Sequence, residues 1–554
     1  MNQTTVHVYP SSDALDRRIR EAMASLVPVT FVSCSDLTAC AEGDAVLNVS
    51  GDREVIEGLR GRKIRSFHAP TGTTGDNEAP ADGRTIHFTR SRVLDERLRG
   101  RSLAHEPLRG YSGLRTAPGD EVLACCGENP VWIVREQEGL PIHLVSVPLP
   151  ALLPGEVPFH RLHAARFFEL LPLLHFLREV TASSGWKSPP LRACMMLDDP
   201  NLHWPSYGFL RYEKLAQQAK ARRFHVALAT VPLDAWIAHP GAVKLFRDHP
   251  EQLSLLVHGN DHSKHELSQS RSKENYLRLA AQSLRRMNRF ERSTGLPVAR
   301  IMAPPHGGFV SNCLAALLSA GFEGACASFG DLFERNSELF GGSTFGLAPA
   351  AVAPESVPVM SRFKLDPSCE GAIVLSAFLD RPIILVGHHH TAADGLELLA
   401  HTAEMVNSLG EVSWGSPEMM LRSNFRTCQE NTTLCIEPYS CRIHLTVPQG
   451  ITDLGLYPPR CSVPNADLEF ALRVKRGSHL LGQQKMNDTP LKVMAGDRIE
   501  LVSLSLGKVD YRKVENPESS LSLRAFPRRL LCEFRDRSMP LIPSDLIPDK
   551  WTSG

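Results

Sequence analysis

The sequence lacks the features of a secreted, membrane-spanning or nucleic-acid-binding protein. No stretch approaches the roughly 20 apolar residues that cross a bilayer, and residues 1–7 have neither the basic start nor the apolar core of a secretory signal. Lys plus Arg and Asp plus Glu both number 61, so the formal net charge is zero. No bulk charge therefore attracts nucleic acid or an anionic membrane, and we expect neither as a partner.

Disulfide and nucleotide-binding signatures are also missing. The 13 cysteines are an odd number and include no CxxC pair, which argues against a disulfide scaffold. Cys125 and Cys126 lie in an apolar run, where free cysteines serve as small core residues. These observations predict a reducing, cytoplasmic location. Neither GxGxxG nor a P-loop motif occurs, so a nucleotide site has no support.

The pattern of apolar residues divides the 554 residues into four regions. Residues 1–150 alternate strand-like and helix-like segments, which predicts an α/β domain of flavodoxin- or amidotransferase-like type. Residues 151–188 form a helical connector in this interpretation. Strands and helices alternate again over residues 189–418, which predicts a parallel sheet that can close into a (β/α) barrel. Short alternating strands over residues 419–554 indicate a C-terminal β-sandwich-like domain.

Two barrel strands end in groups that can bind a divalent metal. One apolar run ends in Asp198 and Asp199, and a later one ends in His258, with His262 four positions further on. The carboxyl ends of parallel strands are where ligands and catalytic groups collect in α/β folds. Two histidines at this spacing share one face of a helix and can chelate if the strand runs into a helix there. A turn with a helix cap, or surface histidines, are the alternatives.

The order of these groups resembles that of polysaccharide-deacetylase-like proteins, also called NodB-homology or carbohydrate esterase family 4 proteins. The resemblance covers about residues 190–415 and includes the double aspartate, the histidine pair, Ala303-Pro304-Pro305-His306-Gly307 and the strand end at His388. It implies a distorted (β/α) barrel and one divalent metal held by an aspartate and two histidines, which are Asp199, His258 and His262 here.

Two positions depart from the family pattern. Gly259 stands where the family has Ser or Thr after its first histidine, and Ala303 stands where it has an arginine that tethers the basic aspartate. Arg300 lies three residues earlier, so in a straight strand its side chain points to the opposite face and does not substitute. The loss of the arginine brings the usual activity or substrate into question.

The chemistry of these residues is coherent by itself. A metal on Asp199, His258 and His262 keeps positions open for water and a substrate carbonyl. Asp198 then accepts the proton of the water, and His388 donates a proton to the leaving group. Zinc suits two imidazoles and a carboxylate best, and nickel, cobalt or iron would also fit. His265 is the competing third ligand.

The remaining candidates concern the proton donor and the substrate. Three histidines follow the last strand, and His388 is preferred over His389 and His390 because it lies nearest the strand end; a polar loop is the alternative. We expect six residues to contact the substrate, with packing of the barrel, or a plain loop position for His306, as the alternative: His203, Trp204, Tyr207, Pro305, His306 and Trp414.

The sequence thus predicts a metal-dependent hydrolase that cleaves a C–N bond of an N-acetylated sugar or related amide. A non-sugar amide hydrolase of the same superfamily is the first alternative, favoured by the missing arginine and the expected cytoplasmic location. A barrel without catalysis that binds carbohydrate or acts as a scaffold is the second. Neither the oligomeric state nor the fold of residues 331–368 follows from the sequence.

Overall fold

The computed structural model describes the chain except for residues 1–2, 53, 72–83, 109–111, 164, 461–469, 477–478, 481–488, 518 and 543–554. The chain forms two compact units. The first comprises residues 1–186, 342–348 and 370–379, and the second comprises residues 187–341, 349–369 and 380–554. The predicted helical connector therefore belongs mostly to the first unit.

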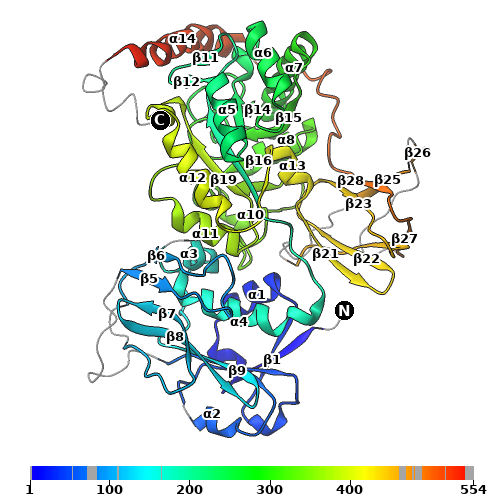
Figure 1. The fold of residues 1–554 in the computed structure, drawn as a ribbon. Helices are drawn as coiled ribbons and strands as arrows, with labels where there is room; N and C mark the ends of the chain where they lie inside the picture. The colour runs from blue at the N-terminus through cyan, green and yellow to red at the C-terminus, as the bar shows by residue number, and fades with distance from the viewer. Residues whose placement is uncertain are drawn as a thin grey trace. The chain divides into compact units, whose positions relative to one another are not determined.

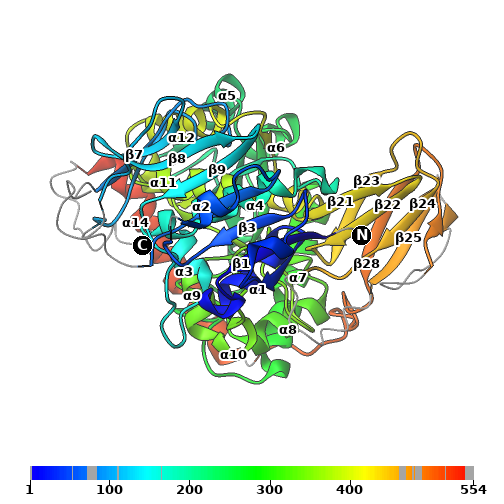
Figure 2. The same ribbon diagram turned by 90° about the horizontal axis from the view of Figure 1, so that it is seen from below.

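The first unit contains a nine-stranded mixed sheet (Figure 2). Its order is β2-β1-β3-β4-β9-β8-β7-β5-β6, parallel from β2 to β9 and antiparallel beyond β9. The strands are β1 Thr4–Tyr9, β2 Val29–Ser33, β3 Ala45–Asn48, β4 Arg65–His68, β5 Thr85–Phe88, β6 Ser102–Ala104, β7 Glu121–Cys126, β8 Asn129–Gln137 and β9 Leu140–Val145.

The helices of this unit follow from their apolar spacing. In α1 (Arg17–Leu26) the buried side chains recur at i, i+3, i+4 and i+7, which are Ile19, Ala22, Met23 and Leu26. Asp16 caps this helix by accepting the Arg18 amide at 2.8 Å. The others are α2 Glu54–Gly58, α3 Pro158–His163, α4 Leu171–Val180 and α11 Glu370–Phe378.

The second unit is built on a parallel barrel sheet (Figure 1). The order is β17-β16-β15-β14-β13-β10-β19-β18, with β20 pairing β10, and every pair is parallel. This confirms the predicted α/β fold class. The strands are β10 Arg192–Asp198, β13 Val226–Thr230, β14 Leu253–His258, β15 Val298–Ala303, β16 Gly324–Ala327, β17 Val359–Ser361, β18 Phe363–Lys364, β19 Ile383–Gly387 and β20 Ser413–Trp414.

The two ends of this sheet meet at one residue. Strands β17 and β18 stand at opposite ends of the hydrogen-bonded order, yet only Arg362 separates them along the chain. The sheet must therefore curl until its ends are neighbours, which makes it a barrel. These two strands lie in the 331–368 segment, whose fold the sequence did not predict.

Helices alternate with the strands as predicted. The longest is α7 (Lys273–Thr294). Ser272 caps its start by accepting the Asn275 amide, and Gly295, with φ +70°, caps its end. The others are α5 Tyr212–Arg222, α6 Pro240–Asp248, α8 Ser311–Ala320, α9 Phe329–Arg335, α10 Ser337–Phe340, α12 Glu397–Asn407 and α13 Pro417–Arg422. No helix in the described part of the chain has both the length and the hydropathy to cross a bilayer.

The C-terminal region forms two four-stranded sheets and one long helix. The sheets are β21-β22-β24-β27 and β23-β28-β25-β26. Their strands are β21 Phe425–Glu430, β22 Thr433–Pro438, β23 Arg442–Thr446, β24 Asp453–Leu456, β25 Phe470–Arg476, β26 His479–Leu480, β27 Leu491–Lys492 and β28 Arg498–Ser503. The prediction of a β-rich domain to residue 554 missed helix α14 (Ser519–Ser538), which lies beside the barrel (Figure 1).

Candidate functional site

Polar side chains gather at the carboxyl end of the barrel strands. Asp198 is the last residue of β10, and Asp199 follows it with φ +83°. His258 ends β14, which is separated from β10 by β13 in the sheet. One ligand atom each from Asp199, His258 and His262 lies within 4.8 Å of the others. The predicted metal ligands therefore come together, and His265 is not part of this group.

A turn, not a helix, brings His262 to the group. Residues 259–266 have no regular helix after β14, which corrects the expectation of two histidines on one helical face. The buried Glu266 carboxylate accepts the backbone amides of Asn260 at 2.6 Å, Asp261 at 3.2 Å and His262 at 3.3 Å. Glu266 thus holds the turn from inside, and His262 adopts φ +54°. Such a nest of amides suits a carboxylate.

Gly259 is required by this turn. Its φ is +61°, and a Cβ atom here would lie 2.0 Å from Glu266 Oε1 and 2.5 Å from Pro305 Cγ. Neither neighbour leaves room for a side chain, so the hydroxyl residue of the family pattern does not fit in this chain. At this position the turn is held by Glu266, which accepts three of its backbone amides.

We expect Gly259→Ser to lower the free energy of unfolding by about 3 kcal/mol, because it adds backbone strain and a steric clash. Chemical denaturation followed by circular dichroism measures this. Gly395→Ser is the matched control, since Gly395 also has positive φ (+83°) but nothing lies within 4 Å of its Cβ position. A loss at Gly259 no larger than that at Gly395 would contradict the clash.

The two histidines are oriented as metal ligands. His258 donates from Nδ1 to the Ala303 carbonyl at 3.2 Å, which leaves Nε2 for coordination. Burial lowers the pKa of His258 to about 3, so the ring is neutral, as a ligand must be. His262 Nε2 lies 3.0 Å from Asp199 Oδ1. A carboxylate and two imidazoles at this separation fit a zinc-type cation.

Arg362 holds the neighbouring carboxylate. Its Nη1 lies 3.0 Å from Oδ1 and 2.8 Å from Oδ2 of Asp198, and its Nη2 donates to the Pro304 carbonyl at 3.1 Å. Burial alone would raise the pKa of Asp198, but Arg362 and His258 outweigh it and lower that pKa below its usual value. Arg362 therefore makes the contact that Ala303 cannot make, while Arg300 points away and pairs with Glu291 at 2.6 Å, as expected.

The three histidines after β19 point to different partners. His388 Nε2 lies 3.9 Å from Asp199 Oδ2, and its side chain is 29% exposed. His389 lies 3.5 Å from Asp536 and packs against the Tyr207 ring. His390 stacks on His388, with centroids 5.4 Å apart. His388 is thus the member of the triple that lies beside the predicted metal ligands.

Helix α14 crosses this end of the barrel. Arg529 Nη1 lies 3.0 Å from Asp199 Oδ1, and Nη2 lies 2.6 Å from Asp234. Arg528 donates to the carbonyls of Asp261 and His262. The side chain of Arg529 is 4% exposed, so a buried cation lies against a predicted metal ligand. Burial would raise the pKa of Asp199, but His262 and Arg529 lower it well below its usual value.

We expect Arg529→Gln to tighten binding of zinc at the barrel site tenfold or more, because the guanidinium repels a divalent cation on the same carboxylate. Isothermal titration of the protein with zinc measures this. Arg537→Gln is the matched control, since Arg537 is on the same helix and bonds Glu533 and Asn201 without touching Asp199. Weaker binding in Arg529→Gln would mean that Arg529 positions the carboxylate instead of competing with the ion.

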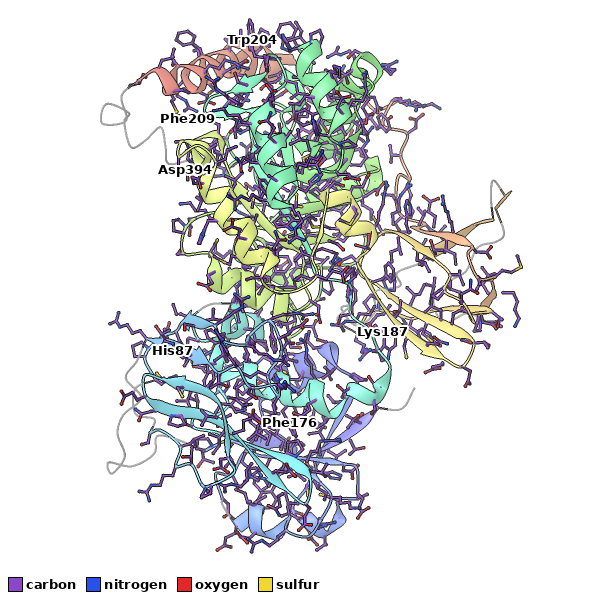
Figure 3. The ribbon with its side chains drawn as sticks, viewed as in Figure 1. His87, Phe176, Lys187, Trp204, Phe209 and Asp394 are labelled. Carbon is purple, nitrogen blue, oxygen red and sulfur yellow. The ribbon has the colours of Figure 1, made fainter. Side chains whose placement is uncertain are left out.

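The predicted substrate residues of the β10 loop contact α14. His203 lies 3.0 Å from Glu533, and the Tyr207 hydroxyl donates to Asp536 at 2.7 Å. Trp204 is 57% exposed and lies near α14 (Figure 3). After β15, Pro305 is buried, and His306 is exposed with its ring centroid 4.7 Å from that of His262. Of these residues, His306 contacts a predicted metal ligand, while His203 and Tyr207 contact α14.

Trp414 lies at the other end of the barrel, which corrects its expected place at the substrate. Strand β20 pairs the start of β10, where Trp414 is opposite Ala193, because α12 returns the chain to the amino ends of the strands. A cavity of about 750 Å³ opens at that end and includes Trp414, Phe224 and Leu253 in its lining. This cavity is remote from the aspartates.

Sequence reasoning missed three residues of the site, which are Arg362, Arg529 and Glu266. Arg362 and Arg529 lie far along the chain from the two aspartates that they contact. Glu266 lies in the loop after β14, where the sequence has no recognised pattern. The run from Leu521 to Phe534 has apolar residues at helical spacing, and this was the one signal that pointed to α14.

Comparisons with known proteins give distant structural matches only. No family model matches the chain, and no curated protein sequence matches it. Solved structures that overlap it include a family 4 carbohydrate esterase from Streptomyces lividans (9% identity, 42% of this chain and 94% of that chain, TM-score 0.25). A family 4 acetyl xylan esterase from Clostridium thermocellum overlaps at 9% identity (41% and 89%, TM-score 0.26), and a CE4 esterase from Streptococcus mutans at 13% (41% and 87%, TM-score 0.24). These likenesses are too distant to assign a family, and the function is argued from the site itself.

Proposed function

We propose that this protein is a metal-dependent hydrolase that cleaves the C–N bond of an acetamido or related amide group. The observation that carries the proposal is the convergence of Asp199, His258 and His262 within 4.8 Å, directly beside the buried carboxylate of Asp198. Zinc is the first candidate metal, since its catalytic sites use three such ligands. Nickel, cobalt and iron accept the same donor set.

The residues around this donor set have separate roles in the proposal. A bound zinc ion would supply a Lewis acid that polarises the amide carbonyl and acidifies water. Asp198 is ionised at neutral pH and accepts a proton from the attacking water. Arg362 fixes the orientation of Asp198 through both carboxylate oxygens. His388, whose Nε2 lies 3.9 Å from Asp199 Oδ2, gives a proton to the leaving amine.

The position of α14 favours a small substrate. Residues Arg528 to Arg537 bond to the loops after β10, β14 and β19, so the helix spans the end of the barrel where the donor set lies. The interior of a long polymer would have to displace this helix and break the Arg529 ion pairs. A single acetamido sugar or a non-sugar amide needs a smaller opening. This agrees with the alternative of a small-amide hydrolase.

A barrel without catalysis is the second candidate. Arg529 pairs with Asp199 at 3.0 Å and Arg362 pairs with Asp198 at 2.8 Å. Both carboxylates are therefore neutralised by protein cations, which is the arrangement expected of a site that has exchanged its metal for a guanidinium. In that case the protein would bind a ligand or partner without turnover.

A substrate screen with metal analysis separates the two. The purified protein is assayed with zinc or cobalt against acetamido sugars, small linear amides and cyclic ureides, and released acid or amine is measured. The hydrolase predicts metal-dependent turnover of at least one class. The absence of turnover together with no uptake of zinc by the barrel would support the scaffold and reject the hydrolase.

A further inference from the structure

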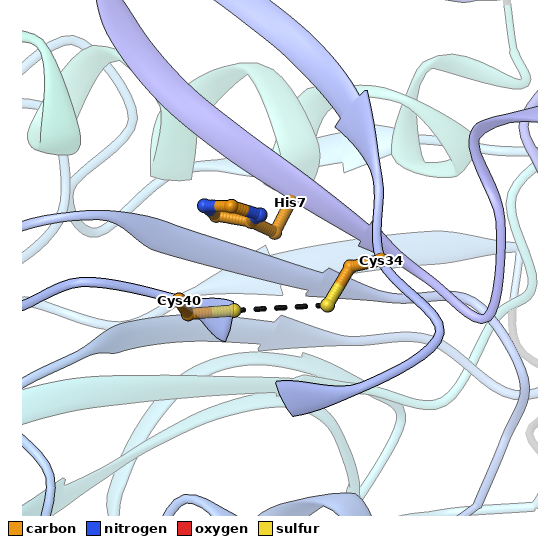
Figure 4. Close-up of side chains that lie close together, drawn as sticks. All are labelled: His7, Cys34 and Cys40. Atoms are coloured by element: carbon orange, nitrogen blue, oxygen red, sulfur yellow. Dashed lines mark hydrogen bonds between the residues drawn. The ribbon is translucent and has the colours of Figure 1, made fainter. Parts of the chain in front are cut away.

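A second group of ligand-type side chains lies in the first compact unit, apart from the barrel. His7 is on β1, Cys34 follows β2, and Cys40 follows the turn Leu37–Ala39. One imidazole nitrogen and the two sulfurs lie within 4.8 Å of one another (Figure 4). The nine-stranded sheet places β1 next to β2, which brings these three residues together.

We propose that His7, Cys34 and Cys40 bind a zinc ion. The two Sγ atoms are 3.7 Å apart. A tetrahedral ion with Zn–S bonds of about 2.3 Å separates two thiolate sulfurs by about 3.8 Å, so the cysteines already have the spacing of zinc ligands. A disulfide would need the sulfurs to approach to about 2.0 Å. The geometry thus favours a bridging ion over a direct bond.

The surroundings hold the three ligands in place. Asp44 Oδ2 lies 2.8 Å from His7 Nε2 and also accepts the Ala41 amide at 2.9 Å, so it orients the ring and adds negative charge beside the cation. Arg62 donates to the carbonyls of Leu37 and Cys40 and thereby fixes the turn that carries Cys40. The sulfurs are buried, while the His7 side chain is 12% exposed, so an ion can enter from that side.

Binding has a defined proton balance. The Cys34 thiol lies 3.3 Å from the Asp36 carbonyl, and the Cys40 thiol lies beside Cys34. Zinc binding releases one proton from each thiol to solvent, and the thiolates and the neutral imidazole each donate an electron pair to the ion. No oxidant is needed, and water completes the coordination.

The other histidine-rich group of this unit does not share these properties. His143, His175 and Glu179 also lie within 4.8 Å of one another. However, Trp132 donates to His143 Nδ1 at 3.2 Å, His143 Nε2 bonds Glu179 at 3.0 Å, and the Asp95 amide donates to His175 Nε2 at 3.1 Å. These nitrogens are used in hydrogen bonds within the protein, which indicates a structural role.

Cobalt(II) is the probe for this site. Reduced full-length protein is titrated with cobalt(II) chloride, and the near-ultraviolet absorption from thiolate-to-cobalt charge transfer is followed. The barrel donor set contains no thiolate, so it does not contribute, and this test is independent of the proposed hydrolase. We expect the band to saturate at one thiolate-bound cobalt per chain, with any cobalt at the barrel adding none of it, and we expect zinc to remove the band. The band should be absent in Cys34→Ser and Cys40→Ser, and shifted in His7→Asn.

Cys125→Ser is the matched control, because Cys125 is in the same unit and is not part of the group; it should keep the band. Circular dichroism establishes that each variant is folded. A wild-type protein without the band would overturn the proposal, as would a band that persists in Cys34→Ser. Loss of two thiols to a disulfide on treatment with peroxide, without any cobalt band, would identify a redox pair instead and would also overturn it.

Discussion

Replacing Asp199 with alanine should remove the barrel metal and abolish hydrolysis. Asp199 supplies the one carboxylate of the donor set, and His258 and His262 alone leave an incomplete site. Loss of one of three ligands from a catalytic zinc site is expected to weaken metal binding by several orders of magnitude. Elemental analysis after dialysis should show one equivalent of zinc less per chain than in wild type, and turnover should fall to background.

Asp248→Asn is the control for this experiment, since Asp248 ends α6 on the exposed surface and pairs only with Lys244 among the contacts described for it. It should keep wild-type metal and activity. The zinc bound by His7, Cys34 and Cys40 should be unaffected in both variants. If Asp199→Ala kept its full metal content and turnover, the barrel would not be a metal centre and the proposed hydrolase would be wrong.

Replacing Asp198 with asparagine should lower kcat by a factor of about 10² to 10⁴ while the metal content stays constant, because a general base of this kind contributes that much. Asparagine preserves the shape of the side chain but cannot accept the proton. Steady-state kinetics on the best substrate of the screen measures the effect. Unchanged turnover would exclude Asp198 as the base.

The pH dependence of kcat in Arg362→Met tests the same proton transfer to Asp198. Arg362 lowers the pKa of Asp198, so its removal must raise that pKa and shift the acid limb of the kcat profile to higher pH. Arg300→Met is the control, since Arg300 pairs with Glu291 on the other side of β15 and should leave the profile unchanged. An unshifted profile in a folded Arg362→Met protein would mean that Arg362 does not tune the base.

The ion pair between Arg362 and Asp198 also determines how the stability of the fold changes with pH. The pKa of Asp198 is lower in the folded chain, so the stabilisation by Arg362 is present above the unfolded pKa and is lost as the pH falls through the folded value. The Arg362→Met variant should therefore lose stability at neutral pH relative to wild type, and the difference between the two should narrow at low pH.

The parts of the fold that depend on local periodicity were predictable. The barrel strands carry continuous apolar runs, and α7 carries apolar residues at helical spacing, so their positions agree with the structure. Asp199 and His258 could be placed at one edge because strand ends in a parallel sheet face the same way. The choice of His262 as the third ligand came from the resemblance to the deacetylase-like family, and the turn that positions it was not predicted.

The contacts made by distant segments were not predictable. Arg362 reaches Asp198 only because β17 and β18 close the barrel, and those strands have three and two residues. Arg529 comes from a helix that follows a β-rich region, and no local pattern relates it to Asp199. Trp414 was misplaced because its expected role came from the resemblance to the family, whereas a segment that follows α12 begins at the amino ends of the parallel strands.

The position of Arg362 between the two end strands of the barrel affects how the protein would lose activity when it is destabilised. Arg362 joins β17 to β18, the two end strands of the barrel sheet, and the same residue forms the ion pair with Asp198. Separation of β17 from β18 by heat, by a proline in either strand or by an insertion would also break the ion pair between Arg362 and Asp198. The barrel wall and the proposed general base are therefore disrupted together. A barrel that has opened only at this point would already have lost its hydrolytic activity.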